Sequence, residues 1–134
     1  MTDVEIIAKV KSLELPKGSY VVFGSCPLAI AGIREAGDID MLVGDDLYKN
    51  FSSRGWVEVD KGPRDKPLTW DVFEAHNHWS FSTYSPTLEQ LLKTADYIDD
   101  IPFASIDEVR KWKVASGRPK DIKDIELIDN YKEG

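Results

Sequence analysis

Two short segments that favour strands limit the folds open to this chain of 134 residues. The first is Tyr20 to Phe23, followed by Gly24-Ser25 and by Pro27, which suits the first turn of a helix. The second, Asp38 to Val43, comes after Gly37, where that helix would end. A helix between two strands buries its apolar side by packing against a sheet. The sequence therefore predicts an α+β fold, with a short central mixed sheet, flanking helices and a C-terminal helical segment.

Capping boxes, helix-stop glycines and apolar periodicity place the other elements. We expect helices over residues 3–12, 27–35, 45–54, 86–94, 105–116 and from 119 onward. We expect strands over 20–23, 38–43, 56–59, 68–75 and 79–84, a loop over 60–68 and a hairpin across His76-Asn77. In the last helix, the buried face would carry Ile122, Ile125, Ile128 and Tyr131. A chain of this length forms one domain, residues 1–134.

Charge and composition disfavour several classes of protein. The chain has 17 Lys and Arg residues against 24 Asp and Glu, a net charge of −7. This charge disfavours long nucleic acid as a partner, whereas one nucleotide or a tRNA end could bind a local basic patch. Cys26 is the single cysteine and fits a reducing compartment. No apolar run approaches about 18 residues and the N-terminus is acidic, so we expect a cytoplasmic protein without a membrane span.

Asp38 and Asp40 are the most informative pair of residues. They alternate with apolar residues in a predicted strand, so both carboxylates lie on one face. A divalent cation relieves their repulsion, and oxygen ligands suit Mg²⁺. Gly24 lets the backbone approach closely, Ser25 adds a hydroxyl, and the following helix start offers N–H groups to phosphates. Together these features indicate chemistry on a nucleoside triphosphate; the alternative is a pair of solvated acids beside a turn.

This pattern of an apolar residue, Gly24-Ser25, a spacer of 12 residues and Asp-apolar-Asp-apolar resembles the nucleotidyltransferase superfamily signature (the polymerase β-like fold). The run from Trp112 to Ile125, with Gly117-Arg118-Pro119-Lys120-Asp121 inside it, resembles a segment of small bacterial members. Those members include relatives of antibiotic nucleotidyltransferases and of toxin–antitoxin nucleotidyltransferases. The two motifs together span residues 23–125.

The resemblance implies a two-metal reaction that moves a nucleoside monophosphate from an NTP to a hydroxyl acceptor, with release of pyrophosphate. It implies that Asp38 and Asp40 hold two Mg²⁺ ions. It makes Asp71 the third metal ligand and the candidate base. Glu74 is a competing candidate, and in a regular strand it would lie on the opposite face from Asp71.

Basic residues near the C-terminus would contact the triphosphate, beside Gly24 and Ser25. The resemblance implies Lys113, Arg118 and Lys120 for this role; alternatively, they are surface residues at a solvated helix start. The acceptor is a small molecule, an RNA end or a protein. Since the chain has little length left for an acceptor domain, a second copy of the chain or a partner protein would complete the acceptor-binding side of the site.

Three further alternatives stay open. His76 and His78 could contact a metal, but without a supporting cysteine or third histidine a surface hairpin turn is favoured. Trp70 and Trp79 could stack on a nucleobase, although core packing is the ordinary role of tryptophan. The whole chain could also be a non-catalytic module of the same fold that binds a nucleotide or a partner, such as a toxin–antitoxin component.

Overall fold

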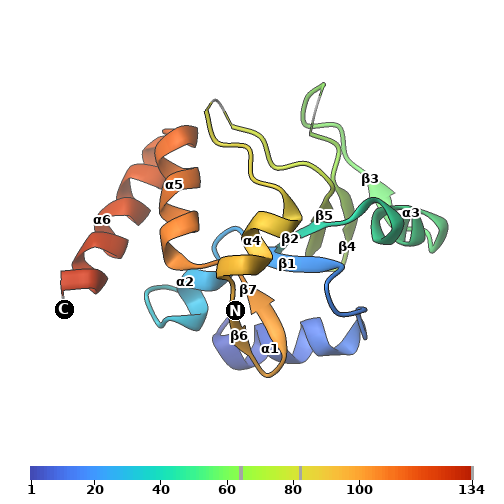
Figure 1. Ribbon diagram of the computed structural model, residues 1–134, viewed down its shortest axis with the longest axis horizontal. Helices are drawn as coiled ribbons and strands as arrows, with labels where there is room; N and C mark the ends of the chain where they lie inside the picture. Colours follow the sequence, from blue (N-terminus) through green and yellow to red (C-terminus); the bar gives the residue numbers. More distant parts are fainter. Residues whose placement is uncertain (64, 82, 134) are drawn as a thin grey trace.

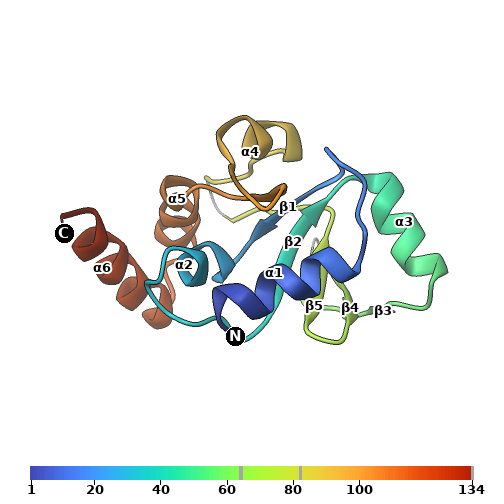
Figure 2. The same ribbon diagram turned by 90° about the horizontal axis from the view of Figure 1, so that it is seen from below.

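A mixed seven-stranded sheet lies at the centre of the structure, with helices on both faces (Figures 1 and 2). This computed structural model describes residues 1–63, 65–81 and 83–133. The helices are α1 (Asp3–Ser12), α2 (Cys26–Ile30), α3 (Asp45–Ser53), α4 (Leu88–Thr94), α5 (Ile106–Ser116) and α6 (Pro119–Glu133). The strands are β1 (Tyr20–Phe23), β2 (Ile39–Val43), β3 (Val57–Glu58), β4 (Leu68–Trp70), β5 (Phe73–His76), β6 (Asp96–Ile98) and β7 (Ile101–Phe103).

The sheet has the order β3-β4-β5-β2-β1-β7-β6 and mixes both kinds of pairing. β2 pairs antiparallel with β1 and parallel with β5, while β7 pairs parallel with β1. The outer pairs, β3–β4, β4–β5 and β6–β7, are antiparallel. This arrangement confirms the predicted α+β class. None of the helices in the described ranges combines the length and apolarity needed to cross a bilayer.

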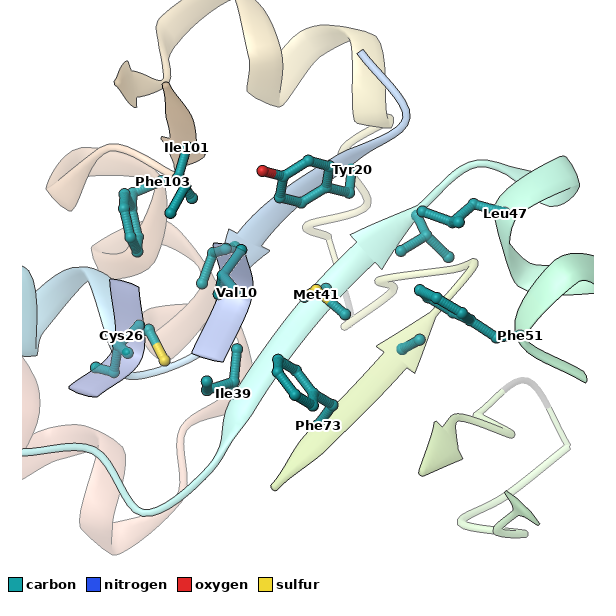
Figure 3. Close-up of a cluster of buried hydrophobic side chains, with 14 of the residues drawn as sticks. Val10, Tyr20, Cys26, Ile39, Met41, Leu47, Phe51, Phe73, Ile101 and Phe103 are labelled. Carbon is teal, nitrogen blue, oxygen red and sulfur yellow. The ribbon is translucent and has the colours of Figure 1, made fainter. Parts of the chain in front are cut away.

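The two faces of the sheet bury different apolar clusters because side chains alternate along each strand. On one face, Met41 packs with Val10 of α1 and with Phe51 of α3 (Figure 3). On the other, Phe23 and Leu42 pack with residues of α4, α5 and α6, among them Leu91, Trp112 and Ile128. In Figure 2, α1 and α3 lie on one side of the sheet, and α4 and α5 lie on the opposite side. Asp40 pairs with Phe23 in the β1–β2 register and so belongs to the face covered by α5.

The structure corrects the prediction for residues 68–84. The run 68–75 is two strands, and the chain turns at Asp71-Val72 instead of at His76-Asn77. Asp71 has a φ of 54°, a left-handed conformation that aspartate tolerates better than most residues. Within the described part of 79–84, the pairing is an isolated bridge between Phe81 and Tyr84. The β6–β7 hairpin was not predicted; its turn residues Asp99 and Asp100 both have positive φ, as a type I′ turn requires.

The predicted buried face of the last helix is correct at Ile128 and wrong at Ile122 and Tyr131. Ile122 and Tyr131 are 54% and 51% exposed, while Asp121 and Asp124 are buried together with Ile128. The helix faces these aspartates inward because basic side chains lie there and pair with them. Those side chains belong to the candidate site described next.

Candidate metal and phosphate site

A cavity of about 250 Å³ lies on the face of the sheet that α5 covers, beside β2 and β5. Its wall carries both acidic and basic side chains. The sheet and the loop before β4 contribute Asp38, Asp40, Asp65 and Glu74, together with Lys61. The link after α2, helix α5 and the start of α6 contribute Arg34, Lys113, Arg118 and Lys120, together with Asp124. A cavity that holds both acids and cations suits a ligand made of a metal ion and phosphates.

Asp40 and Glu74 lie side by side on adjacent parallel strands, as direct partners in the β2–β5 register. One oxygen of each carboxylate and one ring nitrogen of His76 lie within 4.8 Å of one another. Burial, together with the neighbouring Glu74 and Asp38 carboxylates, raises the pKa of Asp40 to about 6. Burial acts in the same direction on Glu74, but hydrogen bonds with Asp40 and Lys61 hold the pKa of Glu74 below its ordinary value. This carboxylate pair therefore requires a positive charge nearby.

Gly24 makes the position of Asp40 possible. A Cβ atom at Gly24 would lie 2.4 Å from Oδ2 and 2.9 Å from Cβ of Asp40, closer than real Cβ atoms come. The φ of Gly24 is +64°, which also favours glycine. The sequence predicted close backbone approach at Gly24; the group that approaches is the Asp40 side chain.

His76 joins the acids from β5, two residues after Glu74 and on the same strand face. Its Nε2 lies 3.4 Å from Oδ1 of Asp40, and its Nδ1 lies 3.3 Å from Oδ1 of Asp65. The ring is buried, whereas His78 is exposed. The favoured prediction of a surface turn at His76 is therefore wrong.

Lys61 supplies the cation next to Glu74. Its Nζ donates a 2.7 Å hydrogen bond to Oε1 of Glu74. The loop that carries Lys61 is closed by a hydrogen bond from the Lys61 N–H to the carbonyl of Asp65. One loop thus brings both Lys61 and Asp65 to the acidic side of the cavity.

Asp38 lies just before β2, exposed and in the cavity wall. Its backbone carbonyl accepts a hydrogen bond of 3.2 Å from Sγ of the buried Cys26. Burial raises the pKa of the Cys26 thiol above its ordinary value, so this cysteine stays a neutral packing residue. Asp38 and Asp40 both line the cavity, but within the described ranges only Asp40 of the two belongs to the group of possible metal ligands with Glu74 and His76.

Asp71 is not brought to this cavity. It lies in the turn between β4 and β5, and its carboxylate forms a 2.8 Å ion pair with Lys9 of α1. Helix α1 covers the opposite face of the sheet (Figure 2). The acid that stands beside Asp40 is Glu74. The turn after Trp70 explains the difference, because it ends the strand that would have presented Asp71.

Lys113 is buried between two aspartates of α6. Its Nζ lies 2.7 Å from Asp124 and 3.5 Å from Asp121, and also 4.6 Å from the centre of the Trp112 ring. Burial acts to raise the pKa of both aspartates. Hydrogen bonds from Arg34 and Lys113 to Asp124, and from Arg118 to Asp121, outweigh burial and leave both pKa values below the ordinary range. The charges of this cluster are therefore mutually satisfied.

Arg34 links Ser25 to the same cluster. Its guanidinium donates two hydrogen bonds to Asp124, at 2.8 and 2.9 Å, and one of 2.7 Å to Oγ of Ser25. Arg118 forms a similar two-bond pair with Asp121. Lys120 is exposed at the first turn of α6. Of the predicted phosphate contacts, Ser25, Lys113, Arg118 and Lys120 line the cavity, while Gly24 packs behind Asp40.

Aromatic rings form the third part of the wall. Trp79 stacks on Phe23 with ring centres 4.7 Å apart and meets Trp112 edge-on at 5.0 Å. Both indole N–H groups are buried and donate no hydrogen bond to any residue in the described ranges. Trp70 lies elsewhere, stacked between Trp56 and Phe73. Because both N–H groups are shielded, Trp79 and Trp112 contribute apolar ring surface to the cavity wall.

Comparisons with models of protein families, with curated proteins and with solved structures find no match for this chain. Sequence reasoning missed Arg34, Lys61 and Asp65 as members of the site. Nothing in their local patterns marked them, because their roles depend on a loop and a link that fold back onto the sheet. The spacing of Glu74 and His76, two residues apart on a β-like run, was a usable signal for a shared face.

Proposed function

We propose that this chain is a metal-dependent nucleotidyltransferase. The observation that carries the proposal is the pairing of Asp40 with Glu74 on adjacent strands, beside Asp38 and opposite basic side chains of the same cavity. Carboxylates and cations that line one cavity suit a metal–triphosphate complex. The predicted reaction transfers a nucleoside monophosphate from an NTP to a hydroxyl acceptor and releases pyrophosphate.

The donor set fits a divalent cation. Asp40 and Glu74 offer oxygens within 4.8 Å of each other, and the exposed Asp38 offers a further carboxylate. We assign the third acidic ligand to Glu74 in place of Asp71. The sequence predicted two Mg²⁺ ions; when bound, such ions neutralise the reacting phosphates and activate the attacking hydroxyl.

The remaining side chains have positioning roles in this proposal. Ser25 and Arg34, joined by a hydrogen bond, face the phosphates together with Lys120. Arg118 keeps N–H donors beyond the two used on Asp121 and is 44% exposed, so it can contact a phosphate without breaking its ion pair. Trp79 and Trp112 offer apolar ring surface to the nucleotide or the acceptor.

One observation favours a non-catalytic nucleotide- or partner-binding module instead. Lys113 and Arg118 already have carboxylate partners, and Lys61 already neutralises Glu74. A cavity in which Lys61, Lys113 and Arg118 are paired in this way is stable without a ligand. The distinguishing result is nucleotide binding without pyrophosphate release.

Thermal denaturation tests the proposed site. Each NTP is added with and without Mg²⁺ to the native chain, to Asp40→Asn and to Asp46→Asn, an exposed control in α3. A ligand at about 100 times its dissociation constant adds about 2.7 kcal/mol, which is several degrees at this chain length. We expect a Mg²⁺-dependent rise in Tm that Asp46→Asn keeps and Asp40→Asn loses. An equal rise in both variants would contradict the proposal.

Pyrophosphate release then separates the enzyme from the binding module. The chain is incubated with Mg²⁺, the preferred NTP labelled at its α-phosphate, and acceptors of three kinds: small hydroxyl compounds, tRNA and protein. We expect pyrophosphate and label transfer to one kind of acceptor. Binding of the nucleotide without either product would favour the module.

A further inference from the structure

His76 has the environment of a metal-binding histidine. Its Nδ1 faces the Asp65 carboxylate at 3.3 Å, and its Nε2 faces Asp40 at 3.4 Å. Histidines that bind metals characteristically donate the other ring N–H to a carboxylate, which fixes the tautomer and the ring orientation. With Nδ1–H donated to Asp65, the Nε2 lone pair faces the group formed by Asp40 and Glu74.

The ring is also held in place by packing. His76 meets the Trp79 ring edge-on with ring centres 4.8 Å apart, and Trp79 is itself stacked on Phe23. The His76 side chain is only 9% exposed. A ligand nitrogen on so constrained a ring loses little conformational freedom when an ion binds.

The combination of oxygen and nitrogen ligand atoms in this group determines which class of cation it favours. Asp40 and Glu74 provide oxygens, and His76 provides one nitrogen, all within 4.8 Å. Mg²⁺ prefers oxygen ligands in octahedral geometry and keeps several waters, whereas imidazole suits first-row transition metals. Mn²⁺ accepts carboxylate oxygens as well.

We propose that the Asp40–Glu74–His76 group binds a divalent transition-metal ion in preference to Mg²⁺, with Nε2 of His76 as a direct ligand and Asp65 as its support. This inference rests on the proposed function, because it names the cation of the same site. Lys61 neutralises the Glu74 carboxylate when no ion is bound, and the ion displaces the Lys61 ammonium because both bind the same carboxylate.

Metal titration is the first half of the test. Chelator-treated protein is titrated with Mn²⁺, read by electron paramagnetic resonance of the free ion, and with Mg²⁺ in competition. We expect Mn²⁺ to bind the native chain about tenfold or more tightly than Mg²⁺. His76→Asn and Asp65→Asn should each weaken Mn²⁺ binding about tenfold or more and change Mg²⁺ binding little. His78→Asn, the same change at the exposed histidine two residues along, should leave both affinities unaltered.

Nuclear magnetic resonance of the native chain is the second half, and it needs no change to the proposed metal ligands. His76 and His78 are the only histidines in the chain. Zn²⁺ serves as a diamagnetic probe, and the ¹⁵N shifts of both rings are followed, with the His78→Asn spectrum giving the assignment. We expect Nε2 of His76 to show the shift of a metal-bound nitrogen while the His78 ring keeps its metal-free shifts.

The outcomes separate this inference from the proposed function. Equal Mn²⁺ and Mg²⁺ affinities, or an unshifted His76 ring at saturating Zn²⁺, would overturn the transition-metal preference and leave the metal–nucleotide site standing. No binding of any divalent cation would overturn both. Loss of Mn²⁺ selectivity in His76→Asn with an intact fold, read by circular dichroism, supports the inference.

Discussion

Replacement of Gly24 by alanine is a sharp test of how this site is built. The new Cβ would lie 2.4 Å from Oδ2 of Asp40, and the backbone would keep a φ of +64°. The left-handed conformation costs a residue with a Cβ about 1–2 kcal/mol. Overpacking against a buried neighbour costs about 1–3 kcal/mol more. We therefore expect Gly24→Ala to lower the free energy of unfolding by about 2–5 kcal/mol.

Gly18→Ala is the matched control. Gly18 has a φ of +79°, but no atom lies within 4 Å of its added Cβ. Gly18→Ala should lower the free energy of unfolding only by the cost of the left-handed conformation, about 1–2 kcal/mol. The free energy of unfolding of both variants is measured by urea denaturation, and Mn²⁺ binding is measured alongside. Because Asp40 must move away from the new Cβ, Gly24→Ala should also lose metal affinity, while Gly18→Ala keeps it.

Equal stability losses in the two variants would refute this reasoning. They would mean that Asp40 does not pack against Gly24 in solution. A Gly24→Ala variant with native Mn²⁺ affinity would equally contradict the claim that Gly24 positions the Asp40 carboxylate.

Three further predictions follow from the charges. Asp124→Asn leaves Lys113 short of a partner in a buried site and should cost about 3 kcal/mol in urea denaturation, whereas Asp129→Asn in an exposed pair should change stability far less. The pKa of Asp124 is lowered in the folded chain, so this carboxylate contributes to the free energy of unfolding above its unfolded pKa of about 3.9. That contribution is lost as the pH falls through the folded pKa. The free energy of unfolding measured below pH 4 should therefore drop less steeply in Asp124→Asn than in the native chain. Glu74→Gln should abolish Mn²⁺ binding and Asp71→Asn should leave it unchanged in the same titration; the reverse result would return the third ligand to Asp71.

The elements that the sequence predicted well are those with strong local signals. Thr2 and Glu5 form a capping box at the start of α1, and the β-rich run Tyr20 to Phe23 is β1 with the predicted bounds. Gly117 ends α5 with a φ of +64°. These signals act within a few residues, so tertiary packing had little to change.

The β6–β7 hairpin escaped prediction because its strands are short and its turn residues are unusual. Asp99 and Asp100 carry positive φ without glycine, and Pro102 interrupts a run that otherwise favours a strand. Pairing of β7 with β1 supplies the stability that local propensity lacks.

The candidate site was predictable in part. The alternation of Asp38 and Asp40 with apolar residues was enough to place both acids in one cavity. The choice between Asp71 and Glu74 depended on where the chain turns, and a turn without glycine at Asp71 gave little warning.

Burial of Asp121 and Asp124 could not be read from α6 alone. An acidic residue on a helix ordinarily faces water. Here Arg34, Lys113 and Arg118 neutralise both carboxylates from two other segments and from the turn before the helix. The periodic isoleucines predicted a face that includes the buried Ile128 but also the exposed Ile122 and Tyr131, because partners distant in sequence decided the orientation.

The most direct test of a metal–nucleotide site is a crystal structure of the chain with Mn²⁺ and a non-hydrolysable NTP, recorded with manganese anomalous scattering. We predict an anomalous peak within bonding distance of the Asp40, Glu74 and His76 side chains. The triphosphate should extend from that peak towards Ser25 and Arg118. A peak that contacts none of the three ligands, or a triphosphate bound outside this cavity, would contradict the proposal.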